Sequence, residues 1–203
     1  MKLRTIALAV AGLSFLVGAG LAQAPEKKAP EKKAAEKKAP EKAGPPKPGP
    51  EVKKLGYFVG KWTSEAEIKP NPMMPAGKVT SNDICSWFKG GFHVVCSSKG
   101  SGAMGAMAGL GIMGYNPEEK VYTYNGIDNG GHLDSAKGTT DGKTWNYTSE
   151  EKMGGKTMYG RYTIGDVQPD SYSFKWDMSE DNKTWNTVME GKTTRVAKPA
   201  EKK

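Results

Sequence analysis

The sequence predicts an all-β protein, folded as an antiparallel up-and-down barrel of about ten strands. Beyond Pro50, aromatic and β-branched residues gather in short runs, and turn-forming Gly, Asn and Asp residues separate these runs. The links between runs are short, and none is long enough for a crossover helix, so neighbours in sequence should pair antiparallel. Closing such a meander into a barrel removes its two exposed edges.

Turn signals and alternation place the individual strands. Residues of one face alternate most clearly in the first strand, as Trp62, Ser64, Ala66 and Ile68, and in the ninth, as Tyr172, Phe174, Trp176 and Met178. The predicted strands lie near residues 61–69, 77–88, 92–99, 109–115, 121–128, 132–140, 143–152, 156–164, 171–178 and 184–195.

Residues 1–24 have the pattern of an export signal. Lys2 and Arg4 precede an apolar run, and small residues follow it. Cleavage after Ala24 would place Pro25 directly after the cut bond, which its fixed φ and missing N–H disfavour, so cleavage after Ala22 competes. The apolar run is short for a membrane span. We therefore expect a periplasmic or secreted protein with no transmembrane segment once the signal is removed.

The charge of the chain is concentrated outside the barrel. Residues 25–50 form a Lys/Pro/Ala/Glu repeat with eight Lys against four Glu, and the tail 197–203 has three Lys against one Glu. Both should be disordered, because neither holds enough apolar residues to form a core. Residues 51–196 have seventeen basic and seventeen acidic residues. This balance argues against nucleic-acid binding and leaves the basic arm either a solubilising spacer or a weak contact to anionic envelope components.

The two cysteines fit one hairpin register. A two-residue turn at Gly90-Gly91 pairs residue 88 with 93, and the same register brings Cys85 opposite Cys96. An oxidising compartment would then join them in a structural disulfide. A redox-active pair is the weaker interpretation, because the C-x-x-C spacing is missing.

The ends of the predicted barrel resemble a known family. The segment Leu55–Trp62 contains Gly60 and Trp62 as a Gly-x-Trp motif, and Arg195 lies on the last strand. This pattern resembles the calycin superfamily of lipocalin-like barrels and, more specifically, the bacterial family called domain of unknown function 1579. Its other elements are Gly90-Gly91-Phe92, Gly114-Tyr115-Asn116-Pro117 and Asp128-Asn129-Gly130-Gly131, with Asn116 where the family usually has Asp. The resemblance implies a barrel over residues 51–196, with Gly60, Trp62 and Arg195 as fold-closing residues, and carries no established activity.

Catalytic and metal-binding patterns are weak. The two histidines, His93 and His132, could bind a metal together with a carboxylate, but nothing in the spacing brings them together, so no metal site is predicted. The sequence has no Gly-x-Ser-x-Gly elbow, and the pairs Glu118-Glu119 and Glu150-Glu151 lie at turns. We therefore predict neither an enzyme nor a cofactor.

The interior of the barrel is the candidate binding site. We expect it to hold a small apolar or amphipathic ligand, with Tyr159 or Arg161 as a polar anchor. The expected lining is Trp145, Tyr147, Tyr172, Phe174, Trp176 and Met178. The alternative is a structural or envelope-interaction protein, in which the barrel is filled and the basic arm tethers it.

Methionines gather in two predicted connections. Met73 and Met74 lie in the Pro-rich loop 70–77, and Met104 and Met107 lie in the glycine-rich segment 100–108, which we expect to be a flexible loop. In a meander both loops emerge at the same end, opposite Trp62. The four methionines are therefore predicted to form a lid over the open end; ligation of Cu(I) by their thioethers is the less favoured interpretation.

Overall fold

The computed structural model describes residues 46–197. The predicted signal peptide, most of the arm 25–50 and nearly all of the tail 197–203 lie outside the described residues.

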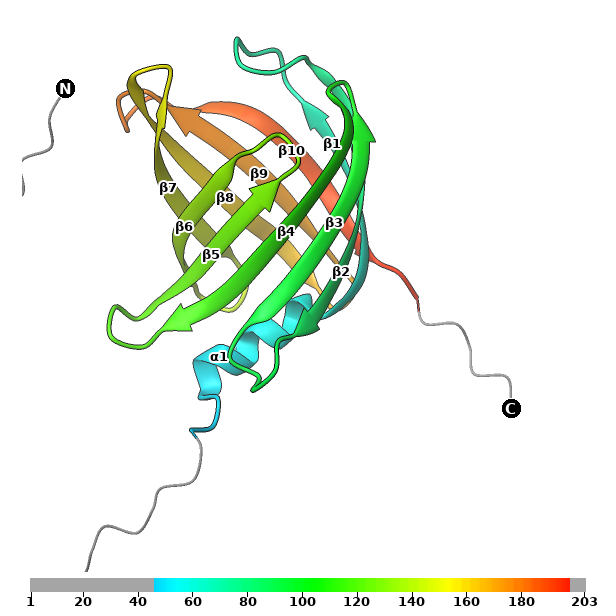
Figure 1. The fold of residues 1–203 in the computed structure, drawn as a ribbon, viewed down its shortest axis with the longest axis vertical. Coiled ribbons are helices and arrows are strands. Elements are labelled where there is room, and N and C mark those ends of the chain that lie inside the picture. Colours follow the sequence, from blue (N-terminus) through cyan, green and yellow to red (C-terminus); the bar gives the residue numbers. More distant parts are fainter. Residues whose placement is uncertain (1–45, 198–203) are drawn as a thin grey trace, which may run out of the picture. The chain divides into compact units, whose positions relative to one another are not determined.

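The described chain forms two short helical segments followed by ten strands. The segments are α1 (Pro50–Lys54), the 3-10 helix η1 (Leu55–Phe58), β1 (Gly60–Ile68), β2 (Gly77–Trp87), β3 (Val94–Gly102), β4 (Gly105–Asn116), β5 (Val121–Asp128), β6 (Leu133–Thr140), β7 (Trp145–Met153), β8 (Lys156–Gln168), β9 (Ser171–Ser179) and β10 (Asn186–Arg195). Each strand pairs antiparallel with its neighbours in sequence, and β1 pairs with β10 to close the barrel (Figure 1). The predicted ten-stranded antiparallel barrel is confirmed.

One end of the barrel is covered by α1 and η1 (Figure 1). The sequence predicted an all-β domain whose first strand begins near residue 61, and these two helical segments were not predicted. Pro50 lies in the first turn of α1, where its missing N–H costs nothing. Val52, Leu55 and Phe58 follow at intervals of three residues and are all buried, which suits one face of a tight helix. The sequence is too short for this period to be recognised in advance.

The glycine-rich segment 100–108 is mostly strand, which corrects the prediction of a flexible loop. β3 extends to Gly102 and β4 begins at Gly105, so only a two-residue turn separates them. Glycine is required here by close approach: a Cβ on Gly102 would lie 2.9 Å from the Lys78 carbonyl oxygen and 2.8 Å from the Val79 side chain. The glycines therefore allow neighbouring strands to pack closely at this point.

The hairpin of β2 and β3 has the predicted register. The Phe88 amide donates to the His93 carbonyl over 2.8 Å, and Cys85 lies opposite Cys96. The two cysteines form a disulfide, with their Cα atoms 4.0 Å apart. Both cysteines face the barrel interior, so the bond lies inside the wall near the closed end.

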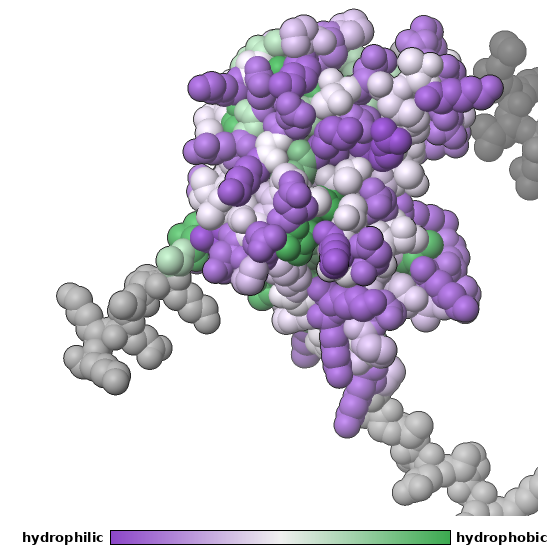
Figure 2. All heavy atoms as spheres, turned by 180° about the vertical axis from the view of Figure 1, so that it is seen from behind, coloured by the Kyte–Doolittle hydropathy of each residue, from purple (hydrophilic) through white to green (hydrophobic). Residues whose placement is uncertain are grey.

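The outer surface differs from the interior in composition. Lysines and carboxylates alternate with the inward-facing residues, and the side of the barrel seen in Figure 2 is mostly hydrophilic with scattered apolar patches. Among the described residues, no helix is long and apolar enough to cross a membrane.

Candidate functional site

The closed end of the interior is a packed apolar core. Its buried residues are Leu55, Phe58, Trp62, Cys85, Val94, Tyr122, Trp145, Tyr147 and Ile164. The Trp62 indole N–H donates to the Phe58 carbonyl over 2.8 Å, which joins β1 to η1. The Tyr122 hydroxyl donates to the Glu51 carboxylate over 2.8 Å, which fixes α1 across this end. The helical cap and the barrel core are therefore one packed unit.

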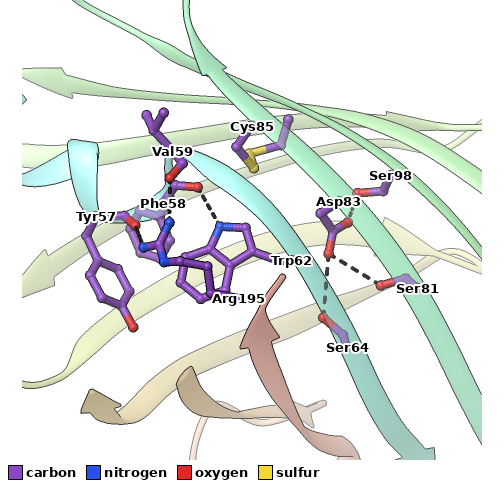
Figure 3. The surroundings of a disulfide bond; sticks show 11 residues. Tyr57, Phe58, Val59, Trp62, Ser64, Ser81, Asp83, Cys85, Ser98 and Arg195 are labelled. Carbon is purple, nitrogen blue, oxygen red and sulfur yellow. Dashed lines mark hydrogen bonds between the residues drawn. A yellow bond between two sulfur atoms is a disulfide. The ribbon is translucent and has the colours of Figure 1, made fainter. Parts of the chain in front are cut away.

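Arg195 completes this closure (Figure 3). Its guanidinium carbon lies 3.9 Å from the centre of the Trp62 ring, and its two terminal nitrogens donate to the carbonyls of Val59 at 2.7 Å and Tyr57 at 2.8 Å. Gly60 has φ +138°, and a Cβ there would lie 2.6 Å from the Arg195 Nη1 atom. Glycine is thus needed for both backbone conformation and space. Arg195 thus packs across the Trp62 ring, and the role of Gly60, Trp62 and Arg195 as fold-closing residues stays a prediction.

Toward the open end, part of the interior is lined by small, polar and aromatic side chains, whereas Ile68 and Met178 are buried and apolar there. We call the first set the mouth half of the interior, and its positions are Ser64, Ser81, Asp83, Ser98, Tyr124, Asp134, Ala136, Ser149, Glu151, Gly160, Tyr162 and Trp176. Asp83 lies opposite Trp62 on β2 and is the polar centre of this half. Its carboxylate accepts hydrogen bonds from Ser98, from Ser81 at 3.4 Å and from Ser64 at 3.5 Å (Figure 3).

Two tyrosines line the space beside Asp83. The Tyr124 ring lies in room left by Gly111 and Gly126, where an added Cβ would come within 2.9 Å and 2.7 Å of its side chain. Burial raises the pKa of Tyr162 well above its usual range, and the neighbouring acidic groups Tyr124 and Asp83 contribute further. Both tyrosines nevertheless keep part of their surface accessible. A side chain that is largely shielded from bulk water but still has some accessible surface lies at the wall of an internal space.

Asp134 on β6 and Glu151 on β7 extend this polar lining toward the mouth. Burial raises the pKa of Asp134, and the nearby Asp128 carboxylate raises it further. Burial likewise raises the pKa of Glu151, and Asp134 adds to the effect. The two carboxyl groups therefore lie near each other in a partly desolvated environment.

The barrel wall opens beside these carboxylates. β6 and β7 pair over only four positions, from Thr140 opposite Trp145 to Lys137 opposite Thr148, although both strands continue toward the mouth. A cleft of about 530 Å³ lies where the pairing ends. Its inward-facing lining is Tyr124, Ala136, Ser149 and Gly160, and its outer lining includes Lys137, Glu150, Tyr159, Asn182 and Trp185. The cleft thus passes from the outer surface toward the mouth half.

The outer rim of the cleft is fixed by a buried carboxylate. Asp177 has 1% of its surface exposed and accepts hydrogen bonds from Arg161 at 2.9 Å and Thr187 at 2.8 Å. Lys175 contributes a further contact at 3.2 Å. The Arg161 guanidinium also lies 4.4 Å from the centre of the Trp185 ring. This network therefore holds the β9–β10 connection, and with it Trp185, against the barrel wall.

The structure divides the predicted ligand-binding residues into three groups. Tyr172, Phe174, Trp176 and Met178 face the interior, as alternation predicted. Trp145 and Tyr147 also face inward but belong to the packed closed-end core. Tyr159 and Arg161 face outward on β8, so neither is an anchor inside the barrel; Tyr159 lines the outer cleft and Arg161 binds Asp177. Contact of any of these residues with a ligand stays a prediction.

The four methionines lie at the mouth, which the β1–β2 and β3–β4 connections share (Figure 1). Met73 and Met104 are exposed, Met74 is partly buried, and Met107 faces the interior from β4. Their predicted role as a lid stays a prediction.

Sequence reasoning missed the residues that distinguish the mouth half, above all Asp83, Tyr124, Asp134 and Glu151. The available signal was register. Once Gly90-Gly91 fixes β2 against β3, Asp83 has the same parity as Cys85 and must face the same side. His93 and His132 are both exposed, and no group of three or more metal-ligating side chains is arranged to hold a metal ion in residues 46–197.

Comparison with known proteins agrees with this architecture. A family model described as a protein of unknown function, DUF1579, matches residues 47–195. No curated protein matches the sequence. Among solved structures, the S-type phycobiliprotein lyase CPES from Guillardia theta is similar with a TM-score of 0.52 and 12% identity, over 71% of this chain and 92% of the lyase. A de novo designed fluorescence-activating β-barrel has a TM-score of 0.41 and 12% identity, over 70% of this chain and 96% of the design.

Proposed function

The chain belongs to the DUF1579 family, and we propose that it is an exported, non-catalytic barrel that binds one small amphipathic molecule in the mouth half of its interior. The observation that carries this proposal is that aromatic side chains of the mouth half face the interior beside polar groups and yet stay partly accessible. The closed end is packed with buried apolar side chains, whereas Tyr124, Tyr162 and Trp176 face inward and stay partly accessible.

A filled barrel would have a different interior. Protein cores are close-packed and apolar, and their polar groups are paired. The mouth half instead combines aromatic rings with carboxyl and hydroxyl groups, which is the composition of a ligand pocket. The adjoining cleft of about 530 Å³ also falls within the usual range for small-molecule sites.

Binding is a better interpretation than catalysis for this interior. Both histidines are exposed, and both cysteines are joined in the disulfide. Histidine and cysteine are thus not available in the mouth half as general base or nucleophile, which leaves only its carboxyl and hydroxyl groups for such roles. The fold itself is neutral on this question, because a phycobiliprotein lyase has a similar barrel.

Export is supported by two independent features. Residues 1–24 have the pattern of a cleavable signal, with the cut after Ala22 or Ala24. The Cys85–Cys96 disulfide is of the kind that persists in oxidising compartments. We therefore propose that the barrel acts in the periplasm or outside the cell.

Native mass spectrometry of the full chain, purified from the envelope fraction of its own host, tests the binding function. We expect a stoichiometric small-molecule adduct in the wild-type protein. Ala136→Trp should eliminate this adduct, because residue 136 faces inward and lines the cleft. Thr139→Trp, on the exposed outer face of the same strand, should keep it.

Circular dichroism and thermal unfolding would show that both variants fold. A wild-type barrel that carries no adduct, or an Ala136→Trp variant that folds and carries the same adduct, would contradict the proposal.

A further inference from the structure

We infer that the ligand carries a positive charge, as an organic amine or ammonium group on an apolar body. This inference rests on the proposed binding function and adds the chemical class of the molecule. Two observations on the interior carry the charge: the sign of the inward-facing charges and the aromatic rings beside them. A buried hydroxyl with no partner supports the presence of a polar ligand and not its charge.

The charges that face the mouth half are negative. Asp83 lies on β2, Asp134 on β6 and Glu151 on β7, so carboxylates reach the space from well-separated parts of the wall. Asp83 is bound by three serine hydroxyls and has no ion pair with any cation of residues 46–197.

The basic side chains at inward-facing positions of the described strands bind partners outside the mouth half. Arg195 is bound to backbone carbonyls at the closed end. Lys156, at the rim, pairs with Glu180 on the β9–β10 connection at 2.9 Å. The other strand lysines and Arg161 have outward-facing parity; the lysines are Lys61, Lys78, Lys99, Lys137, Lys152, Lys175 and Lys192. His132, on the β5–β6 connection, acts on Asp134 and Glu151 but is paired with Asp128 at 2.9 Å. Within residues 46–197 the mouth half is therefore predominantly electronegative.

Aromatic rings border the same space. Tyr124, Tyr162 and Trp176 face inward and stay partly accessible, and Tyr162 stacks on Phe174 with 5.6 Å between ring centres. The negative face of an aromatic ring attracts an organic cation, and this attraction is largest where water is excluded. Carboxylates combined with aromatic faces therefore favour an ammonium headgroup over a carboxylate or phosphate.

Tyr147 belongs to the closed-end core but lies opposite Tyr162 of the mouth half, and within the described chain its hydroxyl is unpaired. Tyr147 faces the interior and has 5% of its surface exposed, and its hydroxyl oxygen has no hydrogen-bond partner among the described residues. Such groups are rare in folded proteins because desolvation without a partner costs free energy. Burial also raises the pKa values of Asp134 and Glu151, so these carboxyl groups oppose folding at neutral pH. Groups with a stability cost are typical of binding sites.

Isothermal titration calorimetry with three probes of the same chain length tests the charge. The probes are decyltrimethylammonium, decyl alcohol and decanoate, each below its micelle-forming concentration, added to the full mature protein after its ligand has been extracted. The ammonium should bind about tenfold more tightly than the alcohol, since one such contact is worth about 1–2 kcal/mol. Decanoate should bind more weakly than both.

Variants connect the preference to the interior. Asp83→Asn and Glu151→Gln should each weaken ammonium binding by about threefold to tenfold, as loss of one nearby charge does, and leave binding of decyl alcohol unchanged. Glu65→Gln provides the control, because Glu65 is exposed on the outer face of β1. If Asp83→Asn does not fold because its serine hydrogen bonds are lost, Glu151→Gln alone tests the inference.

The outcomes separate this inference from the proposed function. If decanoate or the alcohol binds as tightly as the ammonium, or if neither folded variant weakens ammonium binding, the charge is wrong and the binding function stands. Recovery of an anionic or neutral ligand from the native protein would likewise contradict the positive charge and leave the binding function intact. If none of the probes binds and the native protein carries no adduct, both are wrong.

Discussion

Arg195 and Trp62 lie opposite each other across the seam where the last strand meets the first, and the guanidinium covers the indole ring at 3.9 Å. The same guanidinium binds two carbonyls of the segment that enters β1. One residue pair thus joins the N-terminal cap, the first strand and the last strand. Because the two residues are far apart in sequence, their contact exists only when the first and last strands are paired. The pair should therefore contribute strongly to the stability of the closed barrel.

Trp62→Ala should lower the free energy of unfolding by about 3–5 kcal/mol, the usual cost of removing a large aromatic side chain from a core. Trp62 is 2% exposed and also donates to the Phe58 carbonyl. Urea denaturation followed by circular dichroism gives the value. Trp185→Ala, at the outer rim, is the matched control and should cost far less. Equal losses in the two variants would contradict the role of Trp62.

Arg195→Lys should cost about 1–3 kcal/mol although the charge is kept. An ammonium group lacks the planar fork that binds both carbonyls and covers the ring, so a buried acceptor would lose its donor. Urea denaturation of the variant gives this loss. Lys192→Arg, three positions earlier on the outer face of β10, tests the opposite exchange and should leave stability unchanged. A fully stable Arg195→Lys variant would show that charge alone suffices.

The disulfide should contribute about 2–3 kcal/mol, as expected for a ring of this size. Replacing both cysteines by serine should therefore shift the urea midpoint without preventing folding. The wild-type protein measured in a reducing agent should shift by a similar amount, since it loses the same bond. A thiol titration of unreduced, denatured protein should find no free thiol; two free thiols would contradict the structural role.

The strand order and the hairpin register could be predicted because each depends on local signals. Gly90-Gly91 defines one turn, and this turn is sufficient to place Cys85 opposite Cys96. The cap could not be predicted in the same way, because residues 50–58 span only about two helical turns. The glycines of 100–108 indicated a loop, although they lie where strands approach closely.

The candidate site was less predictable because it depends on where pairing stops and which face of a strand is inside. β8 has tyrosine on both faces, with Tyr159 outward and Tyr162 inward, so aromatic content alone does not identify the interior. Arg161 was consequently assigned to the wrong side. The opening between β6 and β7 leaves no mark in either strand, because both continue as strand beyond Lys137 and Thr148.

Asp177→Asn should lower the free energy of unfolding at neutral pH by about 2–3 kcal/mol. This is less than the cost of breaking a fully buried ion pair, because the Arg161 side chain is 37% exposed. Burial would raise the pKa of Asp177, but the hydrogen bonds from Arg161, Thr187 and Lys175 outweigh burial and lower it. A lowered folded-state pKa gives stability that is present above the unfolded value near 3.9 and lost as pH falls.

The difference in melting temperature between wild type and Asp177→Asn should therefore be large at pH 7 and decrease below about pH 4. Asp166→Asn, an exposed position on β8, is the control. A difference that stayed constant down to pH 3 would contradict the ionic role of Asp177.

Asp134→Asn combined with Glu151→Gln should have the opposite effect and raise the melting temperature at pH 7. Burial raises both pKa values above their unfolded values. A raised folded-state pKa means that the favourable contribution is present at low pH and is lost as pH rises through the folded pKa. The wild-type protein therefore loses stability at neutral pH, which the amide variant does not, and the two melting temperatures should converge near about pH 4.

Glu65→Gln is the control and should change the melting temperature neither at pH 7 nor near pH 4. If the ammonium probe binds these carboxylates, it should remove the wild-type disadvantage at pH 7 by stabilising only the protein that has them. If the double variant is less stable than wild type at pH 7, these carboxyl groups stabilise the fold, and the proposal that they serve ligand binding at a cost in stability is contradicted.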